Sequence, residues 1–292
     1  TDSTIDFRVD ASSPTGGTVY DGTSGDQDWN DGSLTQLAGN WLSFNSDTSG
    51  LQKYEYALRR ASDNYYWSVC SGAGTWQSGA NWCDNGTGTS VTQNTLNLQT
   101  GVTYYVSVRA TDNAGNTASA VDSDGQQVSP TFSFTLGTNT ITFDPLNETN
   151  SWTDSKNFTV TTSTNASTGY NIRSYATQDF QSLAYPGEKI PDDSFAGTWD
   201  IPLTWSGYGF GYTSNDPSVQ GSNRFDGGTK YAKFVQTAPG QIPADHTDAV
   251  NGSTGAVSGE EYTITYKVAV PSTQTAASDY RTYIIYIATA NY

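Results

Sequence analysis

Apolar and polar residues alternate along nearly the whole chain, and this period of two constrains the fold more than any other feature. Successive side chains on a β-strand point to opposite faces, so the pattern predicts strands with one buried face. In the first half it covers residues 5–9, 34–44, 53–58, 65–69, 90–98, 103–110 and 117–121. In the second half it covers residues 131–136, 140–143, 157–164, 170–175, 231–236, 262–270 and 280–289.

The composition favours the same class. The chain has 29 Gly, 19 Tyr and no Met, and only 14% of its residues are charged, which suits strands and turns rather than helices. This composition argues against a helical bundle, a coiled coil and an ordinary α/β enzyme. Because 292 residues are too many for one typical domain, we predict an all-β protein of two antiparallel β-sandwich domains in tandem. The domains are residues 1–129 and 130–292, joined by a short stiff connection at residues 128–131.

The net charge of −16 argues against nucleic acid and anionic membrane surfaces as partners. No apolar run approaches 18 residues, so we expect no insertion into a membrane. The sequence begins with Thr1 rather than Met and contains two cysteines. We therefore expect an extracellular or cell-surface protein whose signal peptide has been removed.

Two segments of the first half carry a family resemblance. SGLQKYEYA at residues 49–57, which follows Trp41, and DNAGN at residues 112–116, which follows the alternating strand from Tyr104, resemble the fibronectin type III-like domains of bacterial secreted proteins. The resemblance covers about residues 10–128. It implies an Ig-like sandwich in which Tyr104 is the corner tyrosine, whose hydroxyl bonds back to the backbone. Such modules serve mostly as spacers or binding scaffolds.

The second half has a resemblance of its own. FTVTTSTNASTGY at residues 158–170, WSGY at residues 205–208 and YRTYIIYIATAN at residues 280–291 resemble a poorly characterised β-sandwich domain of bacterial surface proteins. The similarity covers about residues 155–292 and implies no catalytic residues.

The two cysteines, Cys70 and Cys83, bracket a loop rich in Gly and Trp. In a secreted β-protein such a pair predicts one disulfide. A pair of reduced thiols is the alternative.

Asp21, Asp26, Asp28 and Asp31 form the densest acidic cluster, and residues 122–124 hold a second acidic group. Calcium prefers six to eight oxygen ligands, so the cluster is a candidate calcium site, although its spacing is not that of an EF-hand. Solvated turn residues are the other interpretation.

Aromatic residues gather at Trp205, Tyr208, Phe210 and Tyr212, and the last three alternate with glycines. On a strand these three rings would share one face. They could form a flat platform that stacks a carbohydrate, or belong to the core or to a subunit contact.

The sequence offers little for catalysis. No G-x-S-x-G motif occurs, and His246 is the only histidine, in an expected surface loop. Glu260 and Glu261 are adjacent, so on a strand they point to opposite faces and cannot act as a pair. We predict that the protein is not an enzyme and assign no catalytic residue.

The N-terminal segment is the most informative feature for function. Ile5, Phe7 and Val9 alternate with charged residues, which predicts a short strand with one apolar face. It is either the first strand of its own sandwich or a donor strand that completes the sheet of a neighbour. The leading hypothesis is an extracellular structural protein that joins copies of itself in a fibre, a pilus-like filament or a surface layer. The alternative is a carbohydrate-binding or adhesive module of a secreted protein.

Overall fold

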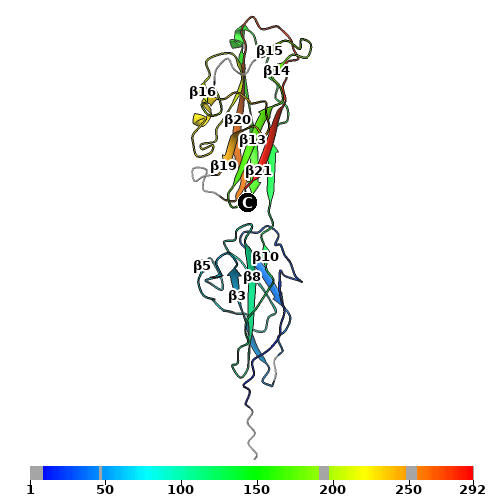
Figure 1. Ribbon diagram of the computed structural model, residues 1–292, viewed down its shortest axis with the longest axis vertical. Helices are drawn as coiled ribbons and strands as arrows, with labels where there is room; N and C mark the ends of the chain where they lie inside the picture. Colours follow the sequence, from blue (N-terminus) through cyan, green and yellow to red (C-terminus); the bar gives the residue numbers. More distant parts are fainter. Residues whose placement is uncertain (1–8, 46–47, 191–196, 248–254, 292) are drawn as a thin grey trace, which may run out of the picture. The chain divides into compact units, whose positions relative to one another are not determined.

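The computed structural model describes residues 9–45, 48–190, 197–247 and 255–291. Its elements are β-strands and two short 3-10 helices, η1 (Glu148–Asn150) and η2 (Asp226–Gly228), which confirms the all-β class (Figure 1). The chain divides into two compact units, Thr1–Pro130 and Thr131–Tyr292. Within the described ranges no helix has the length and apolar character that a bilayer crossing requires.

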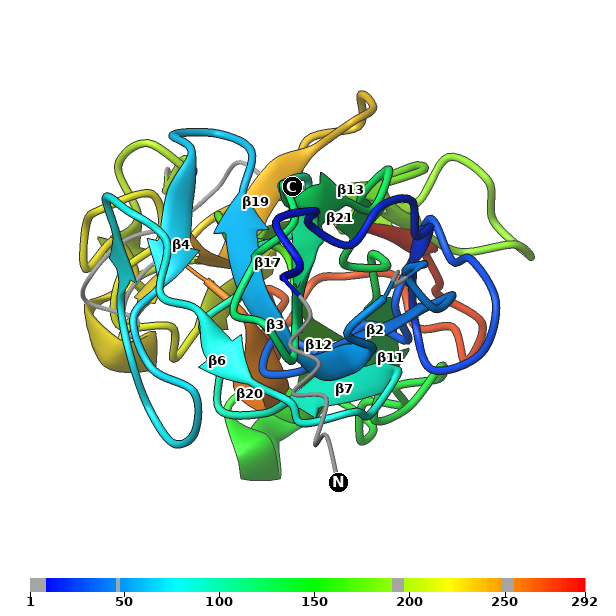
Figure 2. The ribbon, with the colours of Figure 1, turned by 90° about the horizontal axis from the view of Figure 1, so that it is seen from below.

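The first unit contains two antiparallel sheets, which Figure 2 shows with β3, β4 and β6 apart from β2 and β7. The smaller sheet has the order β1 (Val19–Asp21), β2 (Leu37–Trp41), β7 (Ser90–Gln93). The larger sheet has the order β10 (Gln126–Gln127), β8 (Thr103–Asp112), β3 (Leu51–Arg60), β4 (Tyr65–Trp67), β5 (Trp76–Gln77), with β6 (Cys83–Asp84) beside β3 and β9 (Val121–Asp122) beside β8.

The core of the first unit lies between these sheets. The long strands β3 and β8 pair with each other and supply fully buried side chains that include Tyr54, Tyr104 and Val106. The ring of Trp41, from β2, packs edge-on against Tyr54 with 5.8 Å between ring centroids. The Tyr104 hydroxyl accepts a hydrogen bond from the backbone N–H of Gln99 at 2.8 Å, which is the contact that the fibronectin-like resemblance implies.

The second unit also has two main antiparallel sheets. The four-stranded sheet has the order β11 (Phe132–Leu136), β12 (Thr153–Thr164), β20 (Val257–Ala269), β17 (Gly209–Ser214). The three-stranded sheet has the order β19 (Gln241–His246), β13 (Tyr170–Ala176), β21 (Ile284–Ala290). Two strand pairs are separate from these sheets: β14 (Phe180–Gln181) with β15 (Lys189–Ile190), and β16 (Leu203–Thr204) with β18 (Lys230–Tyr231).

Alternating burial shows how the second core forms. Every second side chain is buried along β13, along β12 from Phe158 onward and along β20 from Tyr262 to Val268, because one face of each sheet packs against the other sheet. Phe132 of β11 pairs with Thr164, and Ala290 of β21 pairs with Tyr170. The start of β11 and the end of β21 therefore lie on either side of the connection between β12 and β13.

The structure shortens several predicted strands, and three of them change most. Residues 140–143 are irregular, residues 231–236 are a strand only at Tyr231, and residues 117–121 are a strand only at Val121. In residues 140–143 the alternating apolar residues are partly buried, but they do not form a strand. Ile141 and Phe143 pack on the core while their backbone pairs with no strand in the described residues. Alternation identifies a buried face but does not supply a neighbouring strand.

Candidate functional site

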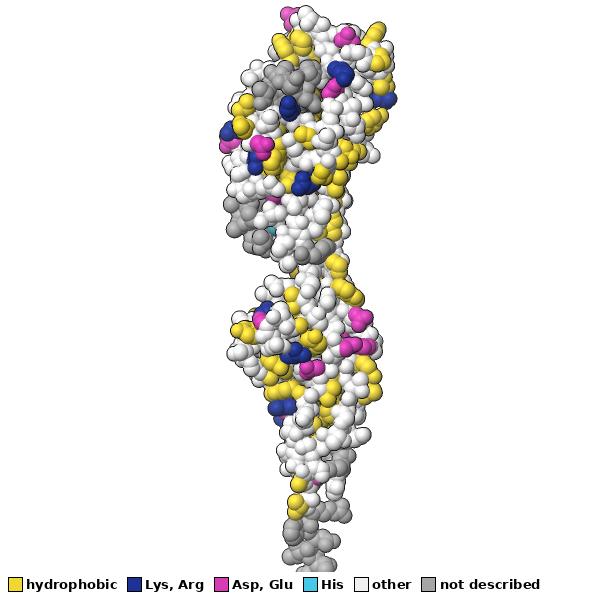
Figure 3. Space-filling model, viewed as in Figure 1, with side chains coloured by type: hydrophobic (Ala, Val, Ile, Leu, Met, Phe, Trp, Pro, Cys, Tyr) yellow, Lys and Arg dark blue, Asp and Glu magenta, His cyan; other side chains and the backbone are white. Residues whose placement is uncertain are grey.

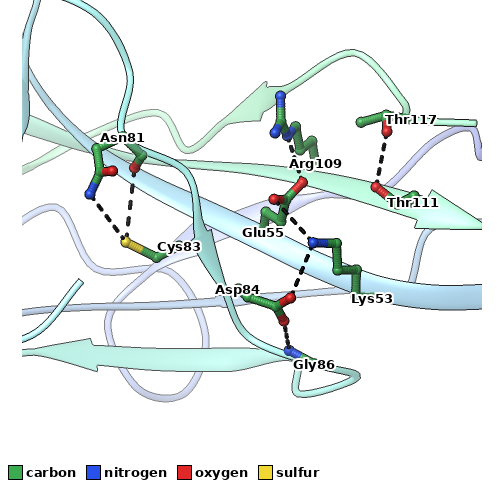
Figure 4. A network of polar contacts seen from close by, with 9 residues as sticks. All are labelled: Lys53, Glu55, Asn81, Cys83, Asp84, Gly86, Arg109, Thr111 and Thr117. Carbon is green, nitrogen blue, oxygen red and sulfur yellow. Dashed lines mark hydrogen bonds and ion pairs between the residues drawn. The ribbon is translucent and has the colours of Figure 1, made fainter. Parts of the chain in front are cut away.

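The predicted disulfide between Cys70 and Cys83 is present and closes the loop that carries β5. Cys83 is buried in β6, which pairs with β3. On the outer face of this pair, the Lys53 ammonium contacts Asp84 at 3.1 Å and Glu55 at 3.3 Å (Figure 4). The crosslink and these ion pairs hold the loop against the larger sheet of the first unit.

The acidic residues are brought together in a different set from the one predicted. The carboxylates of Asp21, Asp26 and Asp124 offer oxygens within 4.8 Å of one another. Asp28 and Asp31 are not part of this group, and the Asp31 carboxylate accepts a bond from the backbone N–H of Ser33 in its own turn. Folding thus brings Asp124, from the second acidic group, beside Asp21 and Asp26 of the first cluster.

Asp21 is fully buried, and burial raises its pKa to about 6. Its carboxyl accepts bonds from the backbone N–H of Gly125 at 2.8 Å and from the side-chain amide of Gln126 at 3.2 Å. These bonds favour the ionised form, but they do not outweigh the loss of hydration.

We expect the first unit to become more stable as the pH falls from 7 to 5. The folded state binds more protons than the unfolded chain between the unfolded and folded pKa values of Asp21, so stability decreases as the pH rises through that window. The gain is about 1 kcal/mol, or roughly 4 °C in Tm. Thermal unfolding at several pH values measures it, and Asp21→Asn should remove the dependence. If Tm of the Asp21→Asn variant changes with pH as much as that of the original chain, Asp21 is not the cause of the pH dependence.

The calcium hypothesis has its own measurement. A bound divalent cation would stabilise the ionised form of Asp21, so added calcium should raise Tm at pH 7 in the original chain and leave Asp21→Asn unaffected. Equal responses of the two proteins would reject a calcium site at this cluster.

The aromatic segment does not form the platform. Phe210 and Tyr212 lie on β17 with their rings buried in the second core, where both contact Phe234. Tyr208 precedes the strand and is exposed. The core interpretation therefore applies to two of the three rings, and these three rings do not form one flat face.

Trp205 takes part in a different cluster. Its ring meets Tyr231 nearly perpendicularly, with 5.3 Å between centroids, and the Lys267 ammonium lies 5.2 Å from the Trp205 ring centroid. Burial lowers the pKa of Lys267. This arrangement is a cation–π contact on the side of β20 that faces away from the core.

His246 is not in a surface loop, as the sequence had indicated, but is buried at the end of β19. Its Nδ1 lies 2.8 Å from the Glu260 carboxylate, which also accepts a bond from the Tyr170 hydroxyl at 2.5 Å. Burial and the adjacent Glu260 raise the pKa of Tyr170. Glu261 points the other way and contacts Thr161, as expected for adjacent strand residues. The side chains of Tyr170, His246 and Glu260 thus link β13, β19 and β20.

The N-terminal strand prediction falls mostly outside the described residues, because Ile5 and Phe7 precede residue 9. Val9 is described; it lies in irregular chain, and its side chain is 78% exposed. The next residue, Asp10, is fixed to the first unit: its carboxylate accepts from the Ser49 N–H at 3.1 Å, and its carbonyl accepts from the Asn116 amide at 3.2 Å.

A feature that sequence reasoning missed lies at one side of the second unit, where the two sheets are unequal. Phe158 of β12 packs on Tyr286 of β21 with 5.9 Å between ring centroids, so β21 lies across from β12. β19 contacts β17 at the other side. In the described part of the chain, the three-stranded sheet therefore has no strand across from β11.

The inward face of β11 is apolar and incompletely covered. Phe132, Phe134 and Leu136 share one face of this strand, and Phe134 packs against the core. Phe132 and Leu136 each keep 37% of their surface exposed. The opposite face carries Ser133 and Thr135. The apolar face thus points into the space that a further strand would cover.

The facing wall is β21, which is an edge strand. Among the described residues it pairs with β13 alone, so the backbone groups on its other side are open to a further strand. Ile285 and Ile287 on its outer face are 38% and 37% exposed. Figure 3 shows apolar side chains along the right-hand side of this unit, where Figure 1 draws β21 in red.

A cavity of about 230 Å³ opens between these two strands. It is lined by Leu136 and Ile284, by polar residues that include Asn139 and Thr282, and by the core rings of Phe158, Phe210 and Tyr266, which we call its aromatic floor. An apolar cavity of about 150 Å³ is known to accept a benzene ring. We call the apolar space between β11 and β21, with this cavity, the β11–β21 groove.

No known protein family matches the chain, and no curated protein is similar to it.

Proposed function

We propose that this protein is an extracellular structural subunit that joins copies of itself in a fibre, a pilus-like filament or a surface layer. The observation that carries the proposal is the incomplete sandwich of the second unit. It combines an edge of β21 that no other described strand pairs with and a largely apolar groove that reaches the core. Soluble sandwiches usually cover or charge such edges, and an open apolar edge is a template for pairing with another chain.

Other features agree with this function. A disulfide forms and persists in oxidising compartments, which supports a location outside the cytosol. The net charge of −16 keeps separate copies soluble, so association would depend on a specific contact rather than on general attraction. The carbohydrate-binding alternative has less support, because Phe210 and Tyr212 are buried.

Electron microscopy of the purified protein in negative stain tests the proposal, with light scattering of the same sample to give the mass. We expect ordered polymers whose repeat corresponds to one chain of 31.3 kDa. Subunit contacts should bury about 1,000 Å² or more each. A homogeneous monomer across a wide range of concentration would overturn the proposal. A glycan array on the same material would then test the adhesive alternative.

A further inference from the structure

We propose that the N-terminal residues 3–9 of one copy lie along the free edge of β21 in another copy, as the fourth strand of its three-stranded sheet. Ile5, Phe7 and Val9 would enter the β11–β21 groove. This inference rests on the proposed function and identifies the site through which it operates. It follows from three observations: an edge of β21 that pairs with no other strand in the described ranges, the exposed apolar face across from it, and a segment whose sequence fits both.

The described part of the first unit forms its sandwich from β1 onward. The smaller sheet of the first unit already begins with β1, so its sandwich has a first strand without residues 5–9. Val9 lies in irregular chain with its side chain exposed, whereas Asp10 is held by Ser49 and Asn116. The segment therefore continues from a fixed point on its own first unit.

The lengths agree. β21 has seven residues, as has the segment 3–9, and at about 3.3 Å per residue each spans roughly 20 Å. Three apolar residues alternate along the segment, and three inward-facing residues, Phe132, Phe134 and Leu136, alternate along β11 across the groove. The cavity has room for one ring, which we assign to Phe7.

The charged residues fix which face turns inward. With Ile5, Phe7 and Val9 in the groove, Asp6 and Arg8 face water beside the outer face of β21. A slip of one residue would bury the two charges against the aromatic floor, which is strongly unfavourable. Backbone bonds along β21 would provide affinity, and the alternation would provide register.

Paired substitutions test the two sides of the joint. Phe7→Asp places a carboxylate in the groove, and Thr4→Asp places the same carboxylate on the face that points to water. On the acceptor, Leu136→Asp adds a charge to the inward face of β11, and Thr135→Asp adds one to its outward face. We expect Phe7→Asp and Leu136→Asp to lower the polymer yield by about 100-fold or more, with both controls near the original level. Circular dichroism and Tm must show that every variant is folded.

Mixing the two defective chains gives the decisive result. The Phe7→Asp chain keeps its groove, and the Leu136→Asp chain keeps its N-terminal segment. Together they can form one joint and no more, so the mixture should yield a 1:1 dimer by light scattering while each chain alone stays monomeric. A synthetic peptide of residues 1–10 should compete with this dimer, and the same peptide with Phe7→Asp should not.

The outcomes separate the two levels of the proposal. If the original chain forms no polymer, the proposed function fails. If it polymerises and either the Phe7→Asp or the Leu136→Asp chain does too, the function stands and this joint is wrong. Absence of the mixed dimer, when both chains are folded and monomeric, also overturns the joint. Inhibition by Thr4→Asp equal to that by Phe7→Asp would show a charge effect instead of insertion.

Discussion

Gly169→Ala should destabilise the second unit by more than about 3 kcal/mol, a loss of roughly 10 °C in Tm. Gly169 has a φ of +73° in the connection between β12 and β13, and a Cβ built there would lie 1.5 Å from the carbonyl oxygen of His246. The His246 carbonyl cannot move away easily, because His246 is the last residue of β19 and its side chain is bound to Glu260. The substitution combines left-handed strain with a backbone clash. Urea or thermal unfolding measures the change.

Gly227→Ala is the matched control. Gly227 has a similar φ of +63°, but an added methyl there would meet no atom within 4 Å. Only the left-handed strain applies, so the expected cost is about 1–2 kcal/mol. Equal losses in the two variants would show that the close approach to His246 contributes nothing.

Removing the disulfide with Cys70→Ala and Cys83→Ala together should lower the stability of the first unit by about 3 kcal/mol. The crosslink closes a loop with a sequence separation of 13, and its loss enlarges the unfolded ensemble. Tm should fall by roughly 10 °C, as should that of the original protein under reductant. The loop should stay partly in place, because the Trp76 indole donates to the Asn97 carbonyl at 3.0 Å and its ring packs on Tyr104. An unchanged Tm would show that the loop needs no crosslink.

Local patterns in the sequence predicted the features that depend on local physics. Alternation located the long strands of both cores, and the cysteine spacing predicted the disulfide, because a strand face and a short loop are each contained in one stretch of chain. The buried positions of Phe210 and Tyr212 remained ambiguous, since a ring on a strand face has the same pattern in a core and on a platform.

The features that sequence reasoning missed depend on contacts between distant segments. Asp124 joins Asp21 only when the chain folds, and His246 is buried because Glu260 and Tyr170 come from other strands. The groove depends on which strands lie at the two edges, and contacts between distant segments decide this. One signal in the sequence points to the groove. Residues 284–287 are apolar at four successive positions, so both faces of β21 carry apolar side chains although the strand lies at an edge of its sheet.

The course of the chain through the second unit has a mechanical consequence. The unit begins and ends beside the same connection, where the Asn165 N–H donates to the Thr131 carbonyl and the Asn291 N–H donates to the Gly169 carbonyl. Tension applied to these two ends would load the terminal bonds of β11 and β21 first and break the ladders one bond at a time, as a zipper opens.

A strand added along β21 from another copy changes this loading. If that copy pulls along the strand axis, the bonds of the new ladder bear the load together in shear, and all of them must yield at once. A filament built in this way would owe its tensile strength to the joints between copies, and the second unit would hold under force only while the pull passes through those joints.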